Sequence, residues 1–226
     1  MKFSALFASL LLMSCIASFA QDSKKSSFNI LIGPSLPVSD FGDKDISDPS
    51  AGLAKTGAFL AFEYDHRLLK NIYLTGRLSG SVNGVDFAYN APTGSSLKMS
   101  MTNWKNANVF IGFSYIHHIS TRFNLIARTL GGLQYTSSPE VKIAISGAFN
   151  GNSVQESAGA TSLGVLLGVG FNYHISQNFG LRLIADYGAA KPTFDIKASG
   201  SGISNDLSSS QNINLINLGI GMSFKL

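Results

Sequence analysis

A four-residue motif of small, apolar, polar and aromatic residues recurs along the chain. It occupies residues 61–64, 112–115, 170–173 and 221–224, and its aromatic residues are 51, 58 and 51 residues apart. After each of the first three copies, a short stretch of turn-forming residues leads into a second alternating run. A supersecondary unit that repeats at this spacing fixes the architecture of a chain. We therefore expect each of these three copies to be the first strand of a β-hairpin with a tight turn.

The residues in each of these runs alternate strictly between two kinds, which is the pattern of a β-strand. One face of each run is apolar and ends in an aromatic residue, whereas the other face is small or polar. Three hairpins supply six strands. The run that begins at Phe28 and the run that ends at Phe224 add one strand at each end. The sequence predicts eight antiparallel strands.

The first twenty residues have the layout of a secretory signal peptide. Lys2 precedes an apolar run, and the small residues Ser18 and Ala20 stand before Gln21. This layout predicts cleavage after Ala20, which leaves residues 21–226 as one domain. The segment that ends at Cys15 loosely resembles a lipobox, so lipidation at Cys15 stays open as an alternative. Because this is the only cysteine, cleavage after Ala20 excludes a disulfide scaffold and a thiol nucleophile from the mature chain.

The charges of the chain give no sign of a nucleic-acid partner. The formal net charge is +4, and the basic residues are scattered instead of being clustered with aromatic residues. Outside the signal peptide, no run of about eighteen apolar residues predicts a transmembrane helix.

Five charged residues fall on regular strand positions of the small and polar face. They are Glu63, Arg77, Arg128, Arg182 and Asp186. Charges at such positions inside a soluble β-sandwich would be costly unless they were paired. The interior of an eight-stranded barrel is just wide enough for side chains to fill it. We therefore expect these five residues to form a lumenal polar network of ion pairs.

Four long connections lie at the end opposite the short turns. They are residues 38–54, 89–101, 136–160 and 191–211. The third contains an alternating run and the pair Asn150-Gly151, which favours a type I′ turn, so we expect two strands to continue upward there. A two-residue turn at this pair would place Tyr135 opposite Leu166. The apolar residues of the two strands would then lie on opposite faces of the sheet. A bulge or a turn of odd length is therefore expected.

The first long connection contains spaced aspartates that resemble the start of a calcium loop. Asp48 and Ala54 stand where that loop requires a glycine and a glutamate. We expect a solvated acidic loop, and no metal or other cofactor.

Short turns at one end, long loops at the other and an even number of alternating strands are typical of an outer-membrane barrel. The predicted fold class is all-β, an eight-stranded antiparallel up-and-down transmembrane β-barrel. In such a barrel the apolar face contacts lipid, and both chain termini lie in the periplasm. The expected periplasmic aromatic girdle is formed by Tyr64, Tyr115, Tyr173 and Phe224. Tyr135 and Tyr187 are candidates for the outer girdle.

The last strand, residues 219–226, resembles the C-terminal signal by which outer-membrane barrels are recognised for assembly. The mature chain resembles the outer membrane protein β-barrel domain family, which includes PorT-like proteins and is similar in architecture to OmpA and OmpX. This resemblance implies a bacterial outer-membrane location, with membrane lipid and the barrel-assembly machinery as partners. It does not imply one activity.

We expect a non-enzymatic barrel with a plugged lumen, whose long loops serve surface binding, adhesion or membrane integrity. An extracellular or secretion-system protein would then bind through the loops. An outer-leaflet lipid-modifying enzyme is a second hypothesis, but the four histidines lie beside the short turns, at the wrong end for its chemistry. They are His66, His117, His118 and His174. A soluble lipocalin-like periplasmic carrier and a PorT-like secretion accessory are the remaining alternatives.

Overall fold

The computed structural model describes residues 25–86, 96–146, 151–200 and 203–226. The predicted signal peptide lies outside this range. The barrel strands are β1 (Ser26–Pro37), β2 (Gly57–Arg67), β3 (Ile72–Asn83), β5 (Trp104–His118), β6 (Phe123–Ser137), β9 (Gly159–His174), β10 (Phe179–Ala190) and β13 (Ile213–Lys225). Five further strands are β4 (Ser96–Met101), β7 (Val141–Ser146), β8 (Gly151–Gln155), β11 (Thr193–Gly200) and β12 (Ile203–Ser210). A 3-10 helix, η1, covers Ser39–Gly42. None of the helical segments in the described part is long and apolar enough to span a bilayer.

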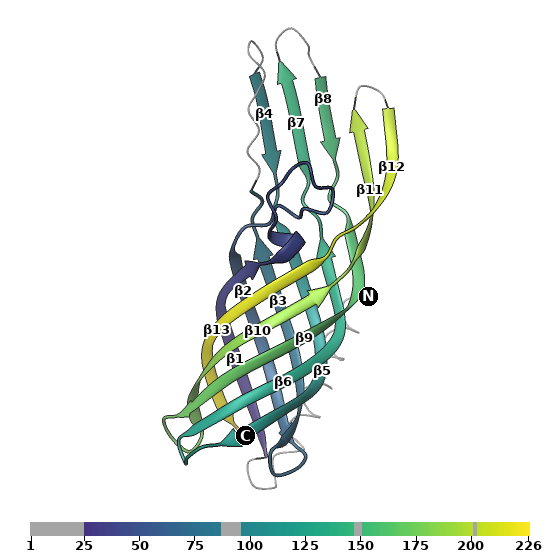
Figure 1. Cartoon of the computed structure of the whole chain (residues 1–226). Helices are drawn as coiled ribbons and strands as arrows, with labels where there is room; N and C mark the ends of the chain where they lie inside the picture. The colour runs from purple at the N-terminus through teal and green to yellow at the C-terminus, as the bar shows by residue number, and fades with distance from the viewer. Residues whose placement is uncertain (1–24, 87–95, 147–150, 201–202) are drawn as a thin grey trace, which may run out of the picture.

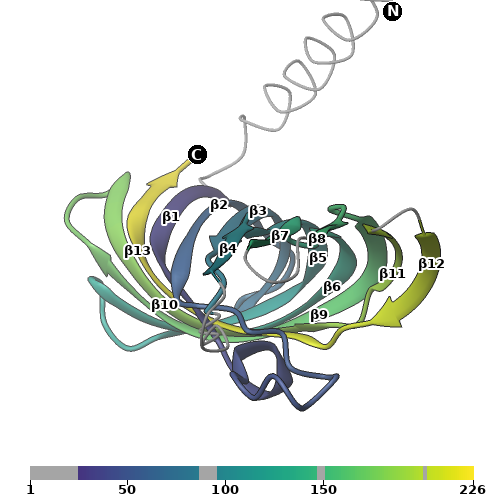
Figure 2. The ribbon, with the colours of Figure 1, turned by 90° about the horizontal axis from the view of Figure 1, so that it is seen from above.

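Eight strands close into an antiparallel barrel in the order β1-β13-β10-β9-β6-β5-β3-β2 (Figures 1 and 2). Strands β1 and β13 close the ring, with Phe28 opposite Phe224. Because the strands follow one another around the ring through hairpins, the predicted eight-stranded up-and-down barrel is confirmed. Closure leaves the barrel without an open sheet edge.

The three short turns share one hydrogen-bonding pattern, as their repeated sequence suggests. In each turn, the first two backbone N–H groups donate to the carbonyl of the residue that begins the next strand, which is Ile72, Phe123 or Phe179. The turn-forming residues that follow each of the first three motifs therefore fold in the same way at all three hairpins.

The outer wall of the barrel is apolar. Ile32, Val169 and Ile220 are 59%, 61% and 55% exposed, whereas the inward-facing residues Leu31 and Asn29 of β1 are fully buried. An exposed apolar surface that runs around a molecule marks contact with an apolar environment or a partner.

A five-stranded sheet rises from the end opposite the short turns, in the order β12-β11-β8-β7-β4 (Figure 1). The two strands predicted within residues 136–160 are β7 and β8. Residues 89–101 and 191–211 were expected to be loops, but they contain β4, β11 and β12. The barrel strands thus continue well beyond the closed ring.

The register of the β6–β9 pair runs unbroken into β7 and β8. Tyr135 lies opposite Thr161 and not opposite Leu166, and Ile145 lies opposite Gly151. The five residues between this last pair make the connection odd in length, which is one of the two expected solutions. Because the apolar residues of both strands stay on the same face of the sheet, no bulge is needed in this hairpin. The turn expected at Asn150-Gly151 includes Asn150, which lies outside the described residues.

Candidate functional site

The five charged residues of the small and polar face lie together inside the barrel. Glu63, Arg77, Arg128, Arg182 and Asp186 project inward from β2, β3, β6 and β10, and each is at most 5% exposed. We call them, together with Asp65, the lumenal network. Three arginines and three carboxylates give this group no net formal charge, which is a condition for burying so many charged side chains.

Asp186 accepts hydrogen bonds from two arginines. Arg128 donates Nε to Oδ1 at 3.0 Å, and its Nη2 lies 2.7 Å from both Oδ1 and Oδ2. Arg77 donates Nη1 to Oδ2 at 2.7 Å. A planar guanidinium that grips both oxygens of a carboxylate fixes orientation as well as charge.

Glu63 contacts all three arginines. Arg77 and Arg128 both donate to its Oε2, and Arg182 Nη1 donates to Oε1 at 2.9 Å. One carboxylate on β2 therefore ties its own strand to three others, β3, β6 and β10.

Asp65 belongs to the network but was not identified from the sequence. It accepts from Arg182 Nη2 at 2.8 Å, from Asn29 Nδ2 at 3.0 Å and from Thr75 Oγ1 at 2.8 Å. Its position two residues after Glu63 puts it on the same strand face. This spacing of two residues was the sequence signal that could have identified Asp65 as a member of the network.

A glycine makes room for the lumenal network. A Cβ atom on Gly168 would lie 2.0 Å from Asp186 Oδ1 and 2.8 Å from Arg128 Nε. No real side chain fits at those distances, so Gly168 lets the ion pair lie flat against the wall of β9.

The inward face was expected to be small and polar throughout, but it also carries large apolar side chains. Buried apolar side chains form two clusters inside the barrel: Leu31, Phe59, Ala61 and Ile184, and separately Phe110, Leu130 and Leu166. These side chains fill lumenal volume between the polar groups.

A third apolar cluster lies where the barrel meets the protruding sheet, and we call it the cap. Its members are Phe41, Ala54, Trp104, Ala160, Phe194, Ile213 and Leu215. Trp104 Nε1 donates to the carbonyl of Gly52 at 3.0 Å, and the Trp104 ring lies 5.4 Å from that of Phe41. The connection between β1 and β2 is thus anchored to the barrel end.

An ion-paired clamp also holds this connection. Asp86 binds Lys44 Nζ at 2.6 Å and Lys55 Nζ at 3.0 Å. Hydrogen bonds from Lys44 and then from Lys55 hold the pKa of the Asp86 carboxyl below its usual value.

The residues named for the lower aromatic girdle lie at the short-turn end. Tyr115 is 49% exposed, Phe224 lies 5.5 Å from the ring of Phe179, and Tyr173 lies 4.9 Å from the ring of Phe123. Tyr64 donates its hydroxyl to Ser26 Oγ at 2.9 Å.

Three of the four histidines make side-chain hydrogen bonds at this same end. Asn124 bridges two of them, through contacts of 2.8 Å to His118 Nδ1 and 2.8 Å to His174 Nε2. His66 Nδ1 lies 2.9 Å from Ser26 Oγ. Within the described residues, no group of three His, Cys, Asp or Glu side chains is arranged to hold a metal.

The fold and the lumen define the protein as a closed antiparallel β-barrel whose interior holds a paired ionic network. No protein-family model matches the chain, and no curated protein matches its sequence.

Solved structures do match, in 52 chains. A major outer membrane protein from Thermus thermophilus is 14% identical, with a TM-score of 0.49 over 89% of this chain and 99% of that chain. Neisserial surface protein A is 14% identical, with a TM-score of 0.44 over 89% and 97%. The outer membrane protease OmpT of Escherichia coli is 8% identical, with a TM-score of 0.38 over 89% and 96%. At these identities, no functional residue transfers from them to this chain.

Proposed function

We propose that the protein is a non-enzymatic integral protein of the bacterial outer membrane, and that its protruding sheet binds partners at the cell surface. In this arrangement the short turns and both termini lie in the periplasm. The apolar outer wall supports membrane insertion, because a closed barrel satisfies its backbone groups internally and can present apolar side chains to lipid.

The lumenal network supports a binding role over conduction. Its side chains link strands on opposite sides of the ring by paired charges, and removing one partner would leave a charge buried without compensation. We therefore assign the network to holding the barrel together and closing the lumen.

The observation that carries the proposal is the continuity between barrel and sheet. Strands β6 and β9 continue in register as β7 and β8, so the surface above the membrane is an ordered extension of a rigid wall. Rigid recognition surfaces lose less conformational entropy on binding. Residues of the protruding sheet can differ between related proteins, and so bind different partners, without any change at the lipid-facing or lumenal positions.

The test is to shorten the β7–β8 hairpin in register. The backbone N–H of Ser138 donates to the carbonyl of Ala158 at 2.8 Å, so residues 139–157 can be replaced by a two-residue Asn-Gly turn above that bond. Binding to host cells, extracellular matrix and neighbouring bacteria is then compared with the wild type. A secretion-system partner, which the PorT-like resemblance suggests, is sought by crosslinking in cells.

A second variant tests the other hairpin of the sheet, by replacing residues 197–206 of β11 and β12 above the pair Ile196–Leu207. Both variants should still migrate differently on a gel before and after heating, as folded membrane barrels do. Loss of binding in at least one variant is expected. Unchanged binding in both variants would overturn the assignment of the sheet, and recovery of the wild type as a soluble periplasmic protein would overturn membrane insertion.

A further inference from the structure

A long apolar groove lies on the outer wall of the barrel, and we call it the outer groove. It follows two neighbouring rows of outward-facing residues across β5, β6, β9 and β10, and this open groove has a volume of about 1000 Å³. One row is Tyr115, Ala127, Val169 and Ala185, and the other is Phe113, Thr129, Leu167 and Tyr187. The volume is at the upper end of the roughly 300–1,000 Å³ found for small-molecule sites.

The sequence explains why this part of the wall is hollow. Ala127 and Ala185 place only methyl groups where neighbouring outward positions carry large side chains, such as Phe113 and Tyr187. Two charged residues, Arg128 and Asp186, belong to the wall of the groove, but their side chains are buried in the lumen and bind each other. Its lining therefore suits a hydrocarbon chain.

The turn between β2 and β3 forms the lower end of the outer groove. Leu68 and Leu69 line it and are 49% and 63% exposed. Asn71 Nδ2 donates to the Tyr115 hydroxyl at 3.4 Å, which fixes the turn against the wall of β5. Lys70, between Leu69 and Asn71, is exposed. The chain therefore places a lysine next to the last apolar residue of this end of the groove.

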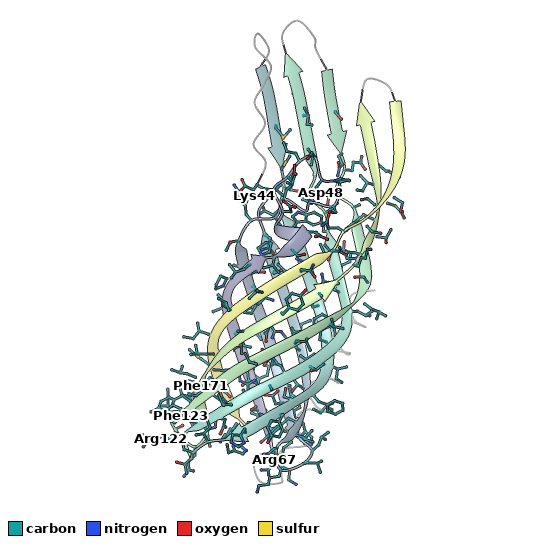
Figure 3. All side chains as sticks on the ribbon, in the orientation of Figure 1. Lys44, Asp48, Arg67, Arg122, Phe123 and Phe171 are labelled. Carbon is teal, nitrogen blue, oxygen red and sulfur yellow. The ribbon has the colours of Figure 1, made fainter. Side chains whose placement is uncertain are left out.

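The two ends of the barrel differ in charge. Arg67 and Arg122 lie at the short-turn end, whereas a residue of each sign, Lys44 and Asp48, lies at the end with the protruding sheet (Figure 3). The basic residues at the short-turn end are Lys25, Arg67, Lys70, Arg122 and Lys225. Among the residues that the structure describes at this end, the acidic side chains Glu63 and Asp65 are buried in the lumenal network. Apart from the C-terminal carboxylate, the charged side chains that the structure describes outside the lumen at this end are therefore basic.

We propose that the outer groove binds an anionic glycerophospholipid of the periplasmic leaflet, with an acyl chain along the two rows and the phosphate at Lys70. Each basic residue near an anionic lipid surface contributes attraction, and the apolar lining matches the chain that hangs from the same headgroup. The proposal rests on the membrane insertion proposed above. It assigns the site to one lipid class on the basis of charge at one end of the groove.

The experiment uses the full-length mature protein in nanodiscs that contain equal amounts of phosphatidylglycerol and phosphatidylethanolamine with identical acyl chains. Lipids that remain bound after gentle release into detergent are counted by native mass spectrometry. The wild type should retain phosphatidylglycerol in preference to phosphatidylethanolamine. Lys70→Gln should reduce that preference about fivefold, because one basic residue is removed from the headgroup site.

Lys105→Gln is the matched control, because Lys105 is an exposed lysine of β5 at the opposite end of the barrel. It should leave the preference unchanged. An unchanged preference with Lys70→Gln would overturn the headgroup site, and a loss of preference with Lys105→Gln alone would place the headgroup in the other leaflet.

A second pair of variants tests the groove itself. Ala127→Phe fills its floor and should displace the retained lipid, whereas Ala107→Phe places the same ring at an exposed alanine of β5 outside the groove. Equal lipid retention by these two variants would overturn the role of the groove. If Ala127→Phe does not fold, the Lys70 comparison still decides.

Membrane insertion is read separately from the difference in gel mobility between unheated and heated samples. Failure of the wild type to insert would contradict the proposed function. Insertion without any preference between the two lipids would overturn the lipid site alone.

Discussion

Arg77 and Asp186 form an ion pair of 2.7 Å between Nη1 and Oδ2, although their strands lie on opposite sides of the barrel. Strand β3 is four places from β10 in either direction around the eight-membered ring. The pair therefore spans the lumen. It connects two walls that have no backbone hydrogen bonds in common.

Asp186→Asn should destabilise the barrel strongly. It removes the charge that Arg77 and Arg128 share while keeping the shape of the side chain. Removing one partner of a buried ion pair costs about 3–5 kcal/mol. The measurement is urea unfolding in lipid vesicles, with Asp195→Asn, an exposed aspartate of β11, as a control of near-zero effect. A cost below about 1 kcal/mol, the range of exposed pairs, would show that the network is solvated.

Two charge substitutions on the lipid face of β9 should differ in cost according to depth. Val169 lies midway along the outward-facing residues of this strand, whereas Leu163 lies near the protruding sheet, and they are 61% and 79% exposed. Val169→Arg should cost about 2–4 kcal/mol and Leu163→Arg about 0–1 kcal/mol in a bilayer. Folding titrations in vesicles measure both. Equal costs would show that the two positions do not lie at different depths in a hydrocarbon layer.

Trp104, the only tryptophan, should report on the cap. It is 7% exposed and packs against Phe41 at 5.4 Å. Phe41→Ala should shift its fluorescence to longer wavelength and make it accessible to acrylamide, because the β1–β2 connection loses its buried anchor. Phe59→Ala removes a buried ring of a different lumenal cluster, and it should leave the emission unchanged. A similar shift in both variants would show that the cap does not open separately from the barrel.

The Asp86 clamp should give the cap a dependence on acid. Hydrogen bonds from Lys44 and Lys55 lower the pKa of the Asp86 carboxyl, so its stabilising contribution is fully present above the unfolded pKa of about 3.9. That contribution is lost as the pH falls through the lower folded pKa. Titration of Trp104 emission should show an acid transition that Asp86→Asn lacks. The same transition in both proteins would mean that another carboxylate controls the cap.

The fold was predictable because alternation is a local property of the sequence. Residues such as Val165, Val169 and Tyr173 reveal their shared face from spacing alone, and the return of the motif at near-constant intervals counts the hairpins. The same parity placed Glu63 and Asp186 on the inward face. The closed ring was predicted because an antiparallel sheet in a membrane can pair all of its backbone groups only by closing.

Pairing across the lumen was harder to predict. Alternation along a strand shows on which face of the sheet a side chain lies, but it does not show which residue that side chain contacts. Asp65 shares a face with Glu63, yet only the closed ring brings it to Arg182. Strand β12 was missed since its serine-rich sequence lacks the apolar alternation that identifies strands, and β11 offered only the short alternation of Phe194, Ile196 and Ala198. Their pairing continues that of β10 with β13, so the neighbouring strands impose an extended conformation that the local sequence does not favour.

The unbroken register from β6 and β9 into β7 and β8 also determines how a pulling force would travel through the molecule. Tension applied at the tip of the hairpin runs along the strands and loads the inter-strand hydrogen bonds of the wall in shear, many at once. A cell held by this hairpin would therefore be tethered through the whole height of the barrel.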